Sequence, residues 1–303
     1  MGEELLQRYE GNPILTHEDV PFLCNAVYNP GAAKVGNKYV LLPRVEDGKR
    51  DNRLHVAWSD NGIDFTIEPE PIALPFSEEH APWEKHLYDP RITLLEGWHY
   101  VTYCAQTMGE LFRIGLFRTK EFKTFERFPY ITQPWTRNCA LFPEKIKGQY
   151  ARFDRTMMGD EVLNFVSYSP DLIHWGNSQL IEITTQTWFR NKWGCGPAPI
   201  KTSDGWLMIF HGVWQAIAPV YRLGVALLDL DEPHRVVAQY PNFIMTPRKV
   251  YERVGEVNNC VFCNGAVVED NGEIKVYYGA ADTSICLAYG TIKSLVSACL
   301  EYA

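Results

Sequence analysis

Short apolar runs separated by glycine-containing turns recur along nearly the whole chain. Five segments share one pattern, an extended apolar run, a turn, and a second run rich in β-branched and aromatic residues: 29–45, 89–105, 139–155, 195–212 and 263–280. The turn glycines, spaced 51 to 67 residues apart, are Gly36, Gly97, Gly148, Gly205 and Gly272. Because glycine supplies the positive φ that tight hairpins need, each segment is predicted to be a β-hairpin.

A third run with β-strand character follows the hairpins, at 54–65, 114–125, 165–175, 221–230 and 285–292. Five imperfect repeats of this kind predict an all-β fold, a five-bladed β-propeller, in a single domain that covers 1–303 with short terminal extensions. Two β-sandwiches are the alternative, but the matching turn in all five repeats favours the propeller. Long helical periodicity is nearly absent, and only 3–9 and 293–303 are candidate helices.

The composition, 46% hydrophobic and 22% charged residues, is typical of a well-packed globular protein. A net charge of −8 disfavours binding to nucleic acid or to an anionic membrane. No run approaches the roughly eighteen apolar residues of a membrane-spanning helix, and the polar, acidic start of the chain is unlike a secretory leader. We therefore expect a cytoplasmic protein with neither a nucleic acid nor a membrane as a partner. The sequence is compatible with a homo-oligomer but does not predict one.

The eight cysteines show no regular pairing. Cys260 and Cys263 form one C-x-x-C, but no second pair or histidine cluster completes a zinc site. We expect these cysteines to be reduced, buried thiols, and we expect no metal site.

One acidic side chain stands at the start of an otherwise apolar strand. Asp89 opens the second hairpin in the stretch "YDPR". The first strand of each propeller blade lines the central channel, so Asp89 is a candidate catalytic acid. An aspartate before a proline also commonly begins a turn, and the residue types alone leave both interpretations open.

Cations gather around the third hairpin of this acidic chain. Residues 137–155 contain Arg137, Lys145, Lys147, Arg152 and Arg155. Polar residues occupy similar places in the other repeats: Arg44, Lys192, His211, Tyr221 and Asp282. A single lysine or arginine is ordinarily a solvated surface residue. The agreement in position across the repeats instead predicts that these groups converge at one mouth of the channel.

Seven stretches resemble, in order, the motifs of glycoside hydrolase family 130: "NAVYNPGA", "LLPRVED", "YDPR", "RNCALFPEKI", "GCGPAPI", "IFHG" and "VYYGAADT". The resemblance extends from about residue 12 to residue 282. That family consists mainly of β-mannoside phosphorylases with a five-bladed propeller, which agrees with the repeat count.

The resemblance implies a role for each matching residue. Asp89 would be the sole general acid, acting through a sugar hydroxyl, and Tyr88 would flank the leaving sugar. The phosphate-binding positions would be Arg137, Arg155, Lys192, His211 and Tyr221. The positions that hold the mannosyl unit would be Asn29, Arg44, Asn138 and Asp282. The chain departs from the family pattern at Thr156, where a proline is usual. We expect the remaining cations of the third hairpin to point outward or to pair with local acids: Lys145, Lys147 and Arg152.

A phosphorylase needs only one carboxylic acid, because phosphate is already an anionic nucleophile, whereas ordinary glycosidases need two. The implied reaction is inverting phosphorolysis of β-1,2- or β-1,4-linked manno-oligosaccharides or mannosyl-glucose disaccharides. It would give α-mannose 1-phosphate and a shortened sugar, with phosphate as co-substrate and no cofactor. The alternatives are a β-mannoside hydrolase of the same family and a non-catalytic sugar-binding propeller. Linkage and acceptor would depend on loops such as 75–86 and 135–138.

Overall fold

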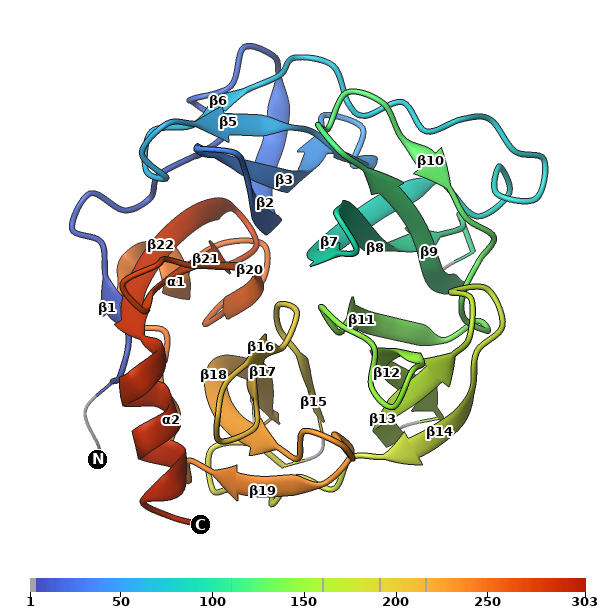
Figure 1. Cartoon of the computed structure of the whole chain (residues 1–303). Helices are drawn as coiled ribbons and strands as arrows, with labels where there is room; N and C mark the ends of the chain where they lie inside the picture. The colour runs from blue at the N-terminus through green and yellow to red at the C-terminus, as the bar shows by residue number, and fades with distance from the viewer. Residues whose placement is uncertain (1–3, 110, 160, 191, 216) are drawn as a thin grey trace.

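The computed structural model describes residues 4–109, 111–159, 161–190, 192–215 and 217–303. Five antiparallel β-sheets stand in a ring about a common axis, one sheet for each predicted repeat (Figure 1). The prediction of a five-bladed propeller is therefore confirmed, and the two-sandwich alternative was wrong. Among the described residues, no helix combines the length and the apolar character that crossing a membrane would require.

Each blade runs from an inner strand at the axis to an outer strand at the rim. Blade 1 contains β2 (Cys24–Val35), β3 (Lys38–Asp47), β4 (Asn52–Leu54), β5 (Ala57–Ser59) and β6 (Thr66–Ile67). Blade 2 contains β7 (His86–Leu95), β8 (Trp98–Gln106), β9 (Phe112–Thr119) and β10 (Glu126–Arg127). Blade 3 contains β11 (Thr136–Leu141), β12 (Tyr150–Met158), β13 (Glu161–Ser169) and β14 (Gly176–Leu180).

The last two blades follow the same plan. Blade 4 contains β15 (Lys192–Cys195), β16 (Ile200–Lys201), β17 (Trp206–Gln215), β18 (Pro219–Leu228) and β19 (Val236–Gln239). Blade 5 contains β20 (Val261–Val268), β21 (Glu273–Ala280), β22 (Ser284–Thr291) and, from the other end of the chain, β1 (Gln7–Arg8). All five predicted turn glycines have a positive φ, and the five predicted third runs overlap β5, β9, β13, β18 and β22.

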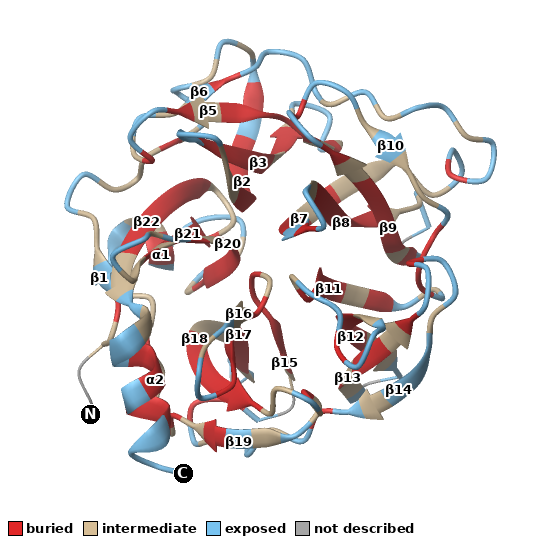
Figure 2. Cartoon of the chain, viewed as in Figure 1, coloured by how far each residue is buried: buried red, intermediate tan, exposed pale blue. Residues whose placement is uncertain are grey.

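Apolar side chains fill the spaces between neighbouring blades. One cluster joins blades 4 and 5 through residues such as Leu207, Val225 and Val276. Another joins blades 3 and 4 through Phe153 and Phe210. The inner and middle strands are largely buried, whereas the rim strand β14 is largely exposed (Figure 2). This packing makes the ring a rigid frame for the side chains at its axis.

The N-terminal segment closes the ring as a strand, so the prediction of a helix at 3–9 was wrong. Within its described part, Gln7 pairs with Tyr289 and Arg8 with Ala288, so that β1 becomes the outer strand of blade 5. The physical reason is tertiary. The edge of β22 has backbone groups that need partners, and Leu6, only 1% exposed, packs into the cluster between blades 4 and 5. The C-terminal helix prediction is confirmed by α2 (Ile292–Leu300).

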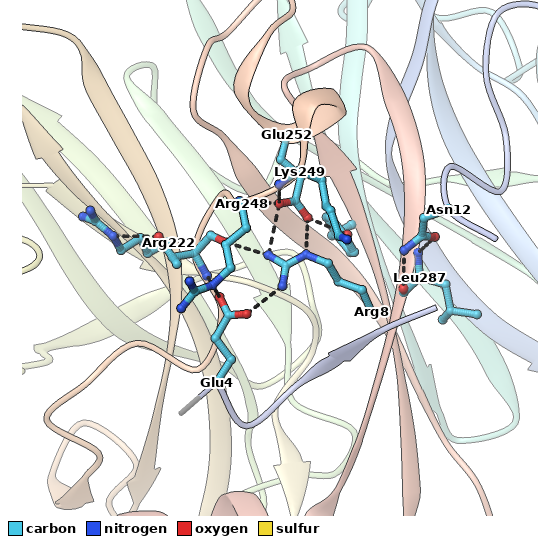
Figure 3. Close-up of polar contacts among 10 residues, drawn as sticks. Glu4, Arg8, Asn12, Arg222, Arg248, Lys249, Glu252 and Leu287 are labelled. Atoms are coloured by element: carbon cyan, nitrogen blue, oxygen red, sulfur yellow. Dashed lines mark hydrogen bonds and ion pairs between the residues drawn. The ribbon is translucent and has the colours of Figure 1, made fainter. Parts of the chain in front are cut away.

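Charged residues secure this closure (Figure 3). Arg8 donates from Nε to Glu252 Oε1 at 2.7 Å and from Nη1 to Glu4 Oε2 at 2.6 Å. Glu252, in α1 (Val250–Arg253) and 0% exposed, also accepts from the Tyr278 hydroxyl at 2.9 Å and from the backbone N–H of Arg248 at 2.7 Å. We call Glu4, Arg8 and Glu252 the closure clasp. Every member of the clasp has an oppositely charged partner.

Candidate active site

A cavity of about 300 Å³ opens at the axis of the ring and is lined by side chains from all five blades. All eleven residues that the sequence predicted for the site line it: Asn29, Arg44, Tyr88, Asp89, Arg137, Asn138, Arg155, Lys192, His211, Tyr221 and Asp282. The predicted convergence at one site is therefore confirmed. The sequence reasoning missed four further lining residues: Gln106, Val257, Cys260 and Phe262.

The inner strands of blades 1, 2 and 3 share a backbone feature that directs side chains into the cavity. The pairing register shifts after Tyr28 in blade 1, after Tyr88 in blade 2 and after Arg137 in blade 3. The residue that follows each shift has a positive φ: 45° at Asn29, 50° at Asp89 and 51° at Asn138. Bulges of this kind re-aim a side chain, and left-handed non-glycine residues cluster at functional sites. Asp89 therefore lies within a bulged strand, and its place before a proline does not start a turn.

The acid lies beside the residues predicted to bind the mannosyl unit. Asp89 Oδ1 accepts from Asn29 Nδ2 at 3.2 Å and from Arg44 Nη1 at 3.3 Å. Asn29 Nδ2 also lies 3.4 Å from Asp282 Oδ1. Burial, together with the nearby charge of Asp89, raises the pKa of Asp282 to about 6. The two carboxylates thus meet at the same amide, on one side of the cavity.

Aromatic rings hold the guanidinium next to the acid. Arg44 Cζ lies 4.5 Å from the centre of the Tyr28 ring and 4.6 Å from that of Tyr88, so that it stacks against both. Arg44 Nε donates to Asn52 Oδ1 at 2.6 Å, and the Tyr88 hydroxyl donates to Gln106 Oε1 at 2.6 Å. Gln106 ends β8, two residues after Cys104, which pairs with Tyr88. The alternation of side chains along that predicted strand was the signal that could have identified Gln106.

The other side of the cavity is cationic and lacks acidic partners. Across the described ranges, no carboxylate oxygen lies within 4.0 Å of the charged nitrogens of Arg137, Arg155 or Lys192. The buried Nε atoms of Arg137 and Arg155 have no hydrogen-bond acceptor there. Arg137 Cζ lies 3.9 Å from the centre of the Phe112 ring. These groups form an anion site that is positively charged before any anion arrives.

Burial and mutual repulsion perturb the cations of this site. Burial is the main cause that lowers the pKa of Arg155 to about 10, and the charge of Arg137 lowers it further. Burial is the main cause that lowers the pKa of Lys192 to about 8, and the charges of Arg155 and Arg137 lower it further. The Lys192 ammonium donates to the Tyr221 hydroxyl at 2.8 Å, and burial raises the pKa of Tyr221 to about 12. A bound anion would relieve the repulsion and restore the charged form of Lys192.

His211 contacts Arg155 in the wall of the cavity and is 0% exposed. Its Nε2 lies 3.2 Å from Arg155 Nη1. Burial lowers the pKa of His211 well below its ordinary value, as do the charges of Arg155 and Arg91. A neutral imidazole that accepts at Nε2 has its proton on Nδ1. His211 therefore orients the Arg155 guanidinium within the anion site.

The remaining cations of the third hairpin pair with acids, as predicted. Lys145 Nζ lies 2.9 Å from Glu96 and Lys147 Nζ lies 3.6 Å from Glu232. The third cation of this group, Arg152, is buried and lies 2.8 Å from Asp154. These three residues do not line the cavity.

The departure from the family pattern at Thr156 leaves Arg155 in place. Thr156 pairs with Thr136 on one side and Leu163 on the other, in the same register as Arg155 with Arg137 and Asn164. A threonine therefore continues β12 without a break. All eight cysteines are free and buried, and Cys260 contributes its side chain to the cavity wall. No group of three or more candidate metal ligands occurs in the part of the chain that the structure describes.

Comparison with known proteins agrees with this geometry. The model of the glycoside hydrolase 130 family, described as beta-1,4-mannooligosaccharide phosphorylase, matches residues 4–301. The chain belongs to glycoside hydrolase family 130. The match covers nearly the whole chain and confirms the resemblance of the sequence motifs.

Two relatives within family 130 differ in their named substrates. The chain is 36% identical to the beta-1,4-mannooligosaccharide phosphorylase of Ruminococcus albus, over 97% of this chain and 90% of that protein. It is 35% identical to the 4-O-beta-D-mannosyl-D-glucose phosphorylase of Bacteroides fragilis, over 95% of this chain and 80% of that protein.

A solved structure of the family shares the fold throughout. The beta-1,2-mannobiose phosphorylase of Listeria innocua, in complex with beta-1,2-mannobiose, superposes with a TM-score of 0.88 at 25% identity. The superposition covers 98% of this chain and 99% of that chain. The two chains therefore share the blades and their order.

Proposed function

We propose that this protein is a β-mannoside phosphorylase, which transfers a mannosyl unit from a β-mannoside to inorganic phosphate. The observation that carries the proposal is the pairing of one acid with an unneutralised anion site in one cavity. Asp89 stands on one side, and Arg137, Arg155 and Lys192 stand on the other with no carboxylate in ion-pair contact in the described ranges. Membership of family 130 supports the same activity.

Asp89 acts as the general acid. It delivers a proton to the leaving sugar oxygen, by way of a sugar hydroxyl as the family resemblance implies. Its hydrogen bonds from Asn29 and Arg44 orient the carboxyl group. Positioned proton transfer of this kind typically contributes about 10² to 10⁴-fold in rate.

Phosphate acts as the nucleophile and needs no general base. Arg137 and Arg155 offer guanidinium donors, and Lys192 adds a compact charge, so that together they offset the desolvation of phosphate and aim it at the anomeric carbon. Attack from the side opposite the leaving group inverts the anomeric centre. The C–O bond to phosphate forms as the glycosidic C–O bond breaks, and the products are α-mannose 1-phosphate and a shortened sugar.

The arrangement of the carboxylates argues against hydrolysis. An inverting glycosidase needs its base on the face of the sugar opposite the acid. Here the second carboxylate, Asp282, meets Asp89 at the same Asn29 amide, and the other side of the cavity is cationic. Asp282 is better placed to accept hydrogen bonds from mannosyl hydroxyls, in company with Arg44 and Asn138. Tyr88 then flanks the leaving sugar.

The proposed reaction needs no cofactor beyond phosphate as co-substrate. The anion site already supplies the positive charge that a metal ion would otherwise contribute. We place the reaction in the cytoplasm as part of the proposal, since eight free, buried cysteines suit a reducing compartment.

The deciding experiment compares three substrates with and without phosphate: β-1,4-mannobiose, β-1,2-mannobiose and 4-O-β-D-mannosyl-D-glucose. Phosphorus NMR would follow mannose 1-phosphate and its anomeric configuration. We expect α-mannose 1-phosphate only when phosphate is present, and the preferred substrate would identify linkage and acceptor. Equal cleavage without phosphate, with release of free mannose, would show that the protein is a hydrolase. Sugar binding without cleavage of any substrate would indicate a non-catalytic propeller.

A further inference from the structure

A buried arginine spans the axis of the ring behind the cavity. Arg91 stands two residues after Asp89 on β7, directly after the register shift, and is 1% exposed. Its Nη1 donates to the carbonyl oxygen of Asp89 at 3.0 Å. Its Nε donates to Gly196 O at 2.7 Å, and its Nη2 donates to Cys195 O at 3.1 Å. These bonds join blade 2 to blade 4, which are separated around the ring by blade 3 (Figure 1).

The two ends of this link are the two halves of the site. One end is the backbone of Asp89, whose φ of 50° is a left-handed conformation that non-glycine residues adopt only when their surroundings hold them there. The other end is the end of β15, the strand that begins at Lys192 and pairs Gly194 with His211. Arg91 therefore connects the acid directly to the strand that carries part of the anion site.

Arg91 makes this link without a counterion. No carboxylate lies within 4.0 Å of its charged nitrogens in the described portion of the chain, and all three of its hydrogen bonds go to backbone carbonyls. Burial is the main cause of the lowered pKa values of Arg155 and His211, and the charge of Arg91 is a further cause of both. Burying an unpaired charge is costly, so simple filling of the channel does not account for an arginine here. A planar fork with five donors is the side chain that can reach three carbonyls on two strands.

We propose that Arg91 is a positioning residue, which holds the Asp89 carboxyl group at its working distance from the anion site by fixing the left-handed backbone of Asp89 against β15. The proposal rests on the proposed function only through the role of Asp89 as the acid. Arg91 does not line the cavity and acts through Asp89. A displacement of about 1 Å in a catalytic group can cost about 100-fold in rate.

The test compares Arg91→Gln and Arg91→Lys on two substrates. One is the preferred disaccharide, whose leaving sugar needs a proton, and the other is 2,4-dinitrophenyl β-mannoside, whose leaving group does not. We expect Arg91→Gln to lower kcat on the disaccharide about 100-fold. On the dinitrophenyl substrate, we expect it to lower kcat by at most about tenfold. Arg91→Lys keeps the charge and most of the volume but cannot reach three carbonyls. Arg91→Lys should also slow the disaccharide more than the dinitrophenyl substrate, but by a smaller factor. If Arg91→Gln gives too little folded protein, Arg91→Lys alone is used for the test.

The matched control is Arg113→Gln in the same blade. Arg113 also donates to a backbone carbonyl, that of Thr132 at 2.8 Å, but unlike Arg91 it has no hydrogen bond to Asp89 among the described residues. The Arg113→Gln variant should have a changed melting temperature, but its ratio of kcat on the disaccharide to kcat on the dinitrophenyl substrate should equal that of the wild type. If both Arg91 variants slow the two substrates equally, or leave the disaccharide rate intact, Arg91 only fills the channel and the proposal is overturned. The ratio can be measured whether the wild type releases mannose 1-phosphate or free mannose, so it is separate from the test of phosphorolysis.

Discussion

Two clusters of charged residues in this propeller, the closure clasp and the anion site, are built in opposite ways. In the closure clasp, Arg8 contacts both Glu4 and Glu252. In the anion site, Arg155 contacts a neutral histidine, and further cations stand close to it. Burial alone would lower both pKa values, but the two carboxylates raise that of Arg8 above its ordinary value, whereas that of Arg155 falls to about 10. The clasp uses its charges to close the ring, and the anion site keeps its charges available for a ligand.

The acids of the two clusters differ in the same way. Glu252 accepts from Arg8, from Tyr278 and from backbone N–H groups, and it is fully enclosed. The Asp89 carboxylate accepts only two longer bonds, from Asn29 and Arg44, in the part of the chain that the structure describes. Structural partners thus occupy the acceptor sites of Glu252, whereas the Asp89 carboxyl group keeps acceptor sites for a substrate among the described residues. Stability and reactivity are thus separated between the rim and the axis of the ring.

The largest expected effect is on Asp89→Asn. This change should keep the fold and sugar binding but lower kcat on a natural β-mannoside by about 10² to 10⁴-fold, because the proton donor is lost. A dinitrophenolate leaving group should partly restore the rate. Steady-state kinetics on both substrates would measure this, and near-normal activity on the natural substrate would remove Asp89 from its role as the acid.

Glu252→Gln should affect stability and not catalysis. It breaks a buried ion pair and leaves Arg8 without its enclosed partner, which typically costs about 3–5 kcal/mol. Denaturant unfolding should show this loss, while the apparent constant for phosphate stays at the wild-type value. If the free energy of phosphate binding changed by as much as the free energy of unfolding, the clasp and the anion site would be coupled.

Arg155→Ala should show the reverse pattern. Each charge-assisted hydrogen bond contributes about 1.5–3 kcal/mol, so the apparent phosphate constant should rise by roughly ten- to a hundredfold. Removing one member of a repelling group should leave stability nearly unchanged. Lys192→Glu should weaken phosphate further, because it puts a negative charge at the anion site.

The control for these two variants is Lys145→Ala, from the same hairpin as Arg155. Lys145 pairs with Glu96 and does not line the cavity. Initial rates against phosphate concentration should therefore match the wild type. An equal rise for Lys145→Ala and Arg155→Ala would mean that general positive charge, and not the cavity, attracts phosphate.

The smallest expected effect comes from pH. The pKa of Lys192 is about 8, so at pH 9 only about one molecule in ten carries the proton before an anion binds. Anion affinity should fall about tenfold between pH 7 and pH 9. Inhibition by sulfate measures this cleanly, since the charge of sulfate is constant over that range. A flat profile would contradict the lowered pKa.

Deprotonation of Lys192 weakens anion binding as the pH rises, but in the unliganded protein it increases the stability of the folded state. The pKa of Lys192 is lower in the folded state than its ordinary value of 10.5, so between pH 8 and pH 10.5 the unfolded state binds more protons. The contribution of Lys192 to stability therefore rises with pH across that window. Comparing unfolding of the wild type with that of Lys192→Met between pH 8 and pH 10 would isolate this contribution.

The features that depend on neighbours along the chain could be predicted from the sequence. The five hairpins, their turn glycines and the C-terminal helix follow from local patterns, and Thr291 caps that helix by accepting from the backbone N–H of Ser294 at 3.1 Å. Repetition of the unit predicted the ring. Positional agreement between repeats, together with the family motifs, then identified eleven residues of one cavity, because equivalent positions in successive blades face the same axis.

The features that join distant parts of the chain could not be predicted, because they form only when the blades pack together. The sequence of residues 3–9 predicts a helix, yet Arg8 contacts Glu252, 244 positions away, and β1 fills the open edge of blade 5. The link from Arg91 to Gly196 and the position of Gln106 beside Tyr88 likewise depend on how strands and blades pack. Local pattern cannot predict such contacts, because their free energy comes from backbone and charged groups that have no partner until the ring closes.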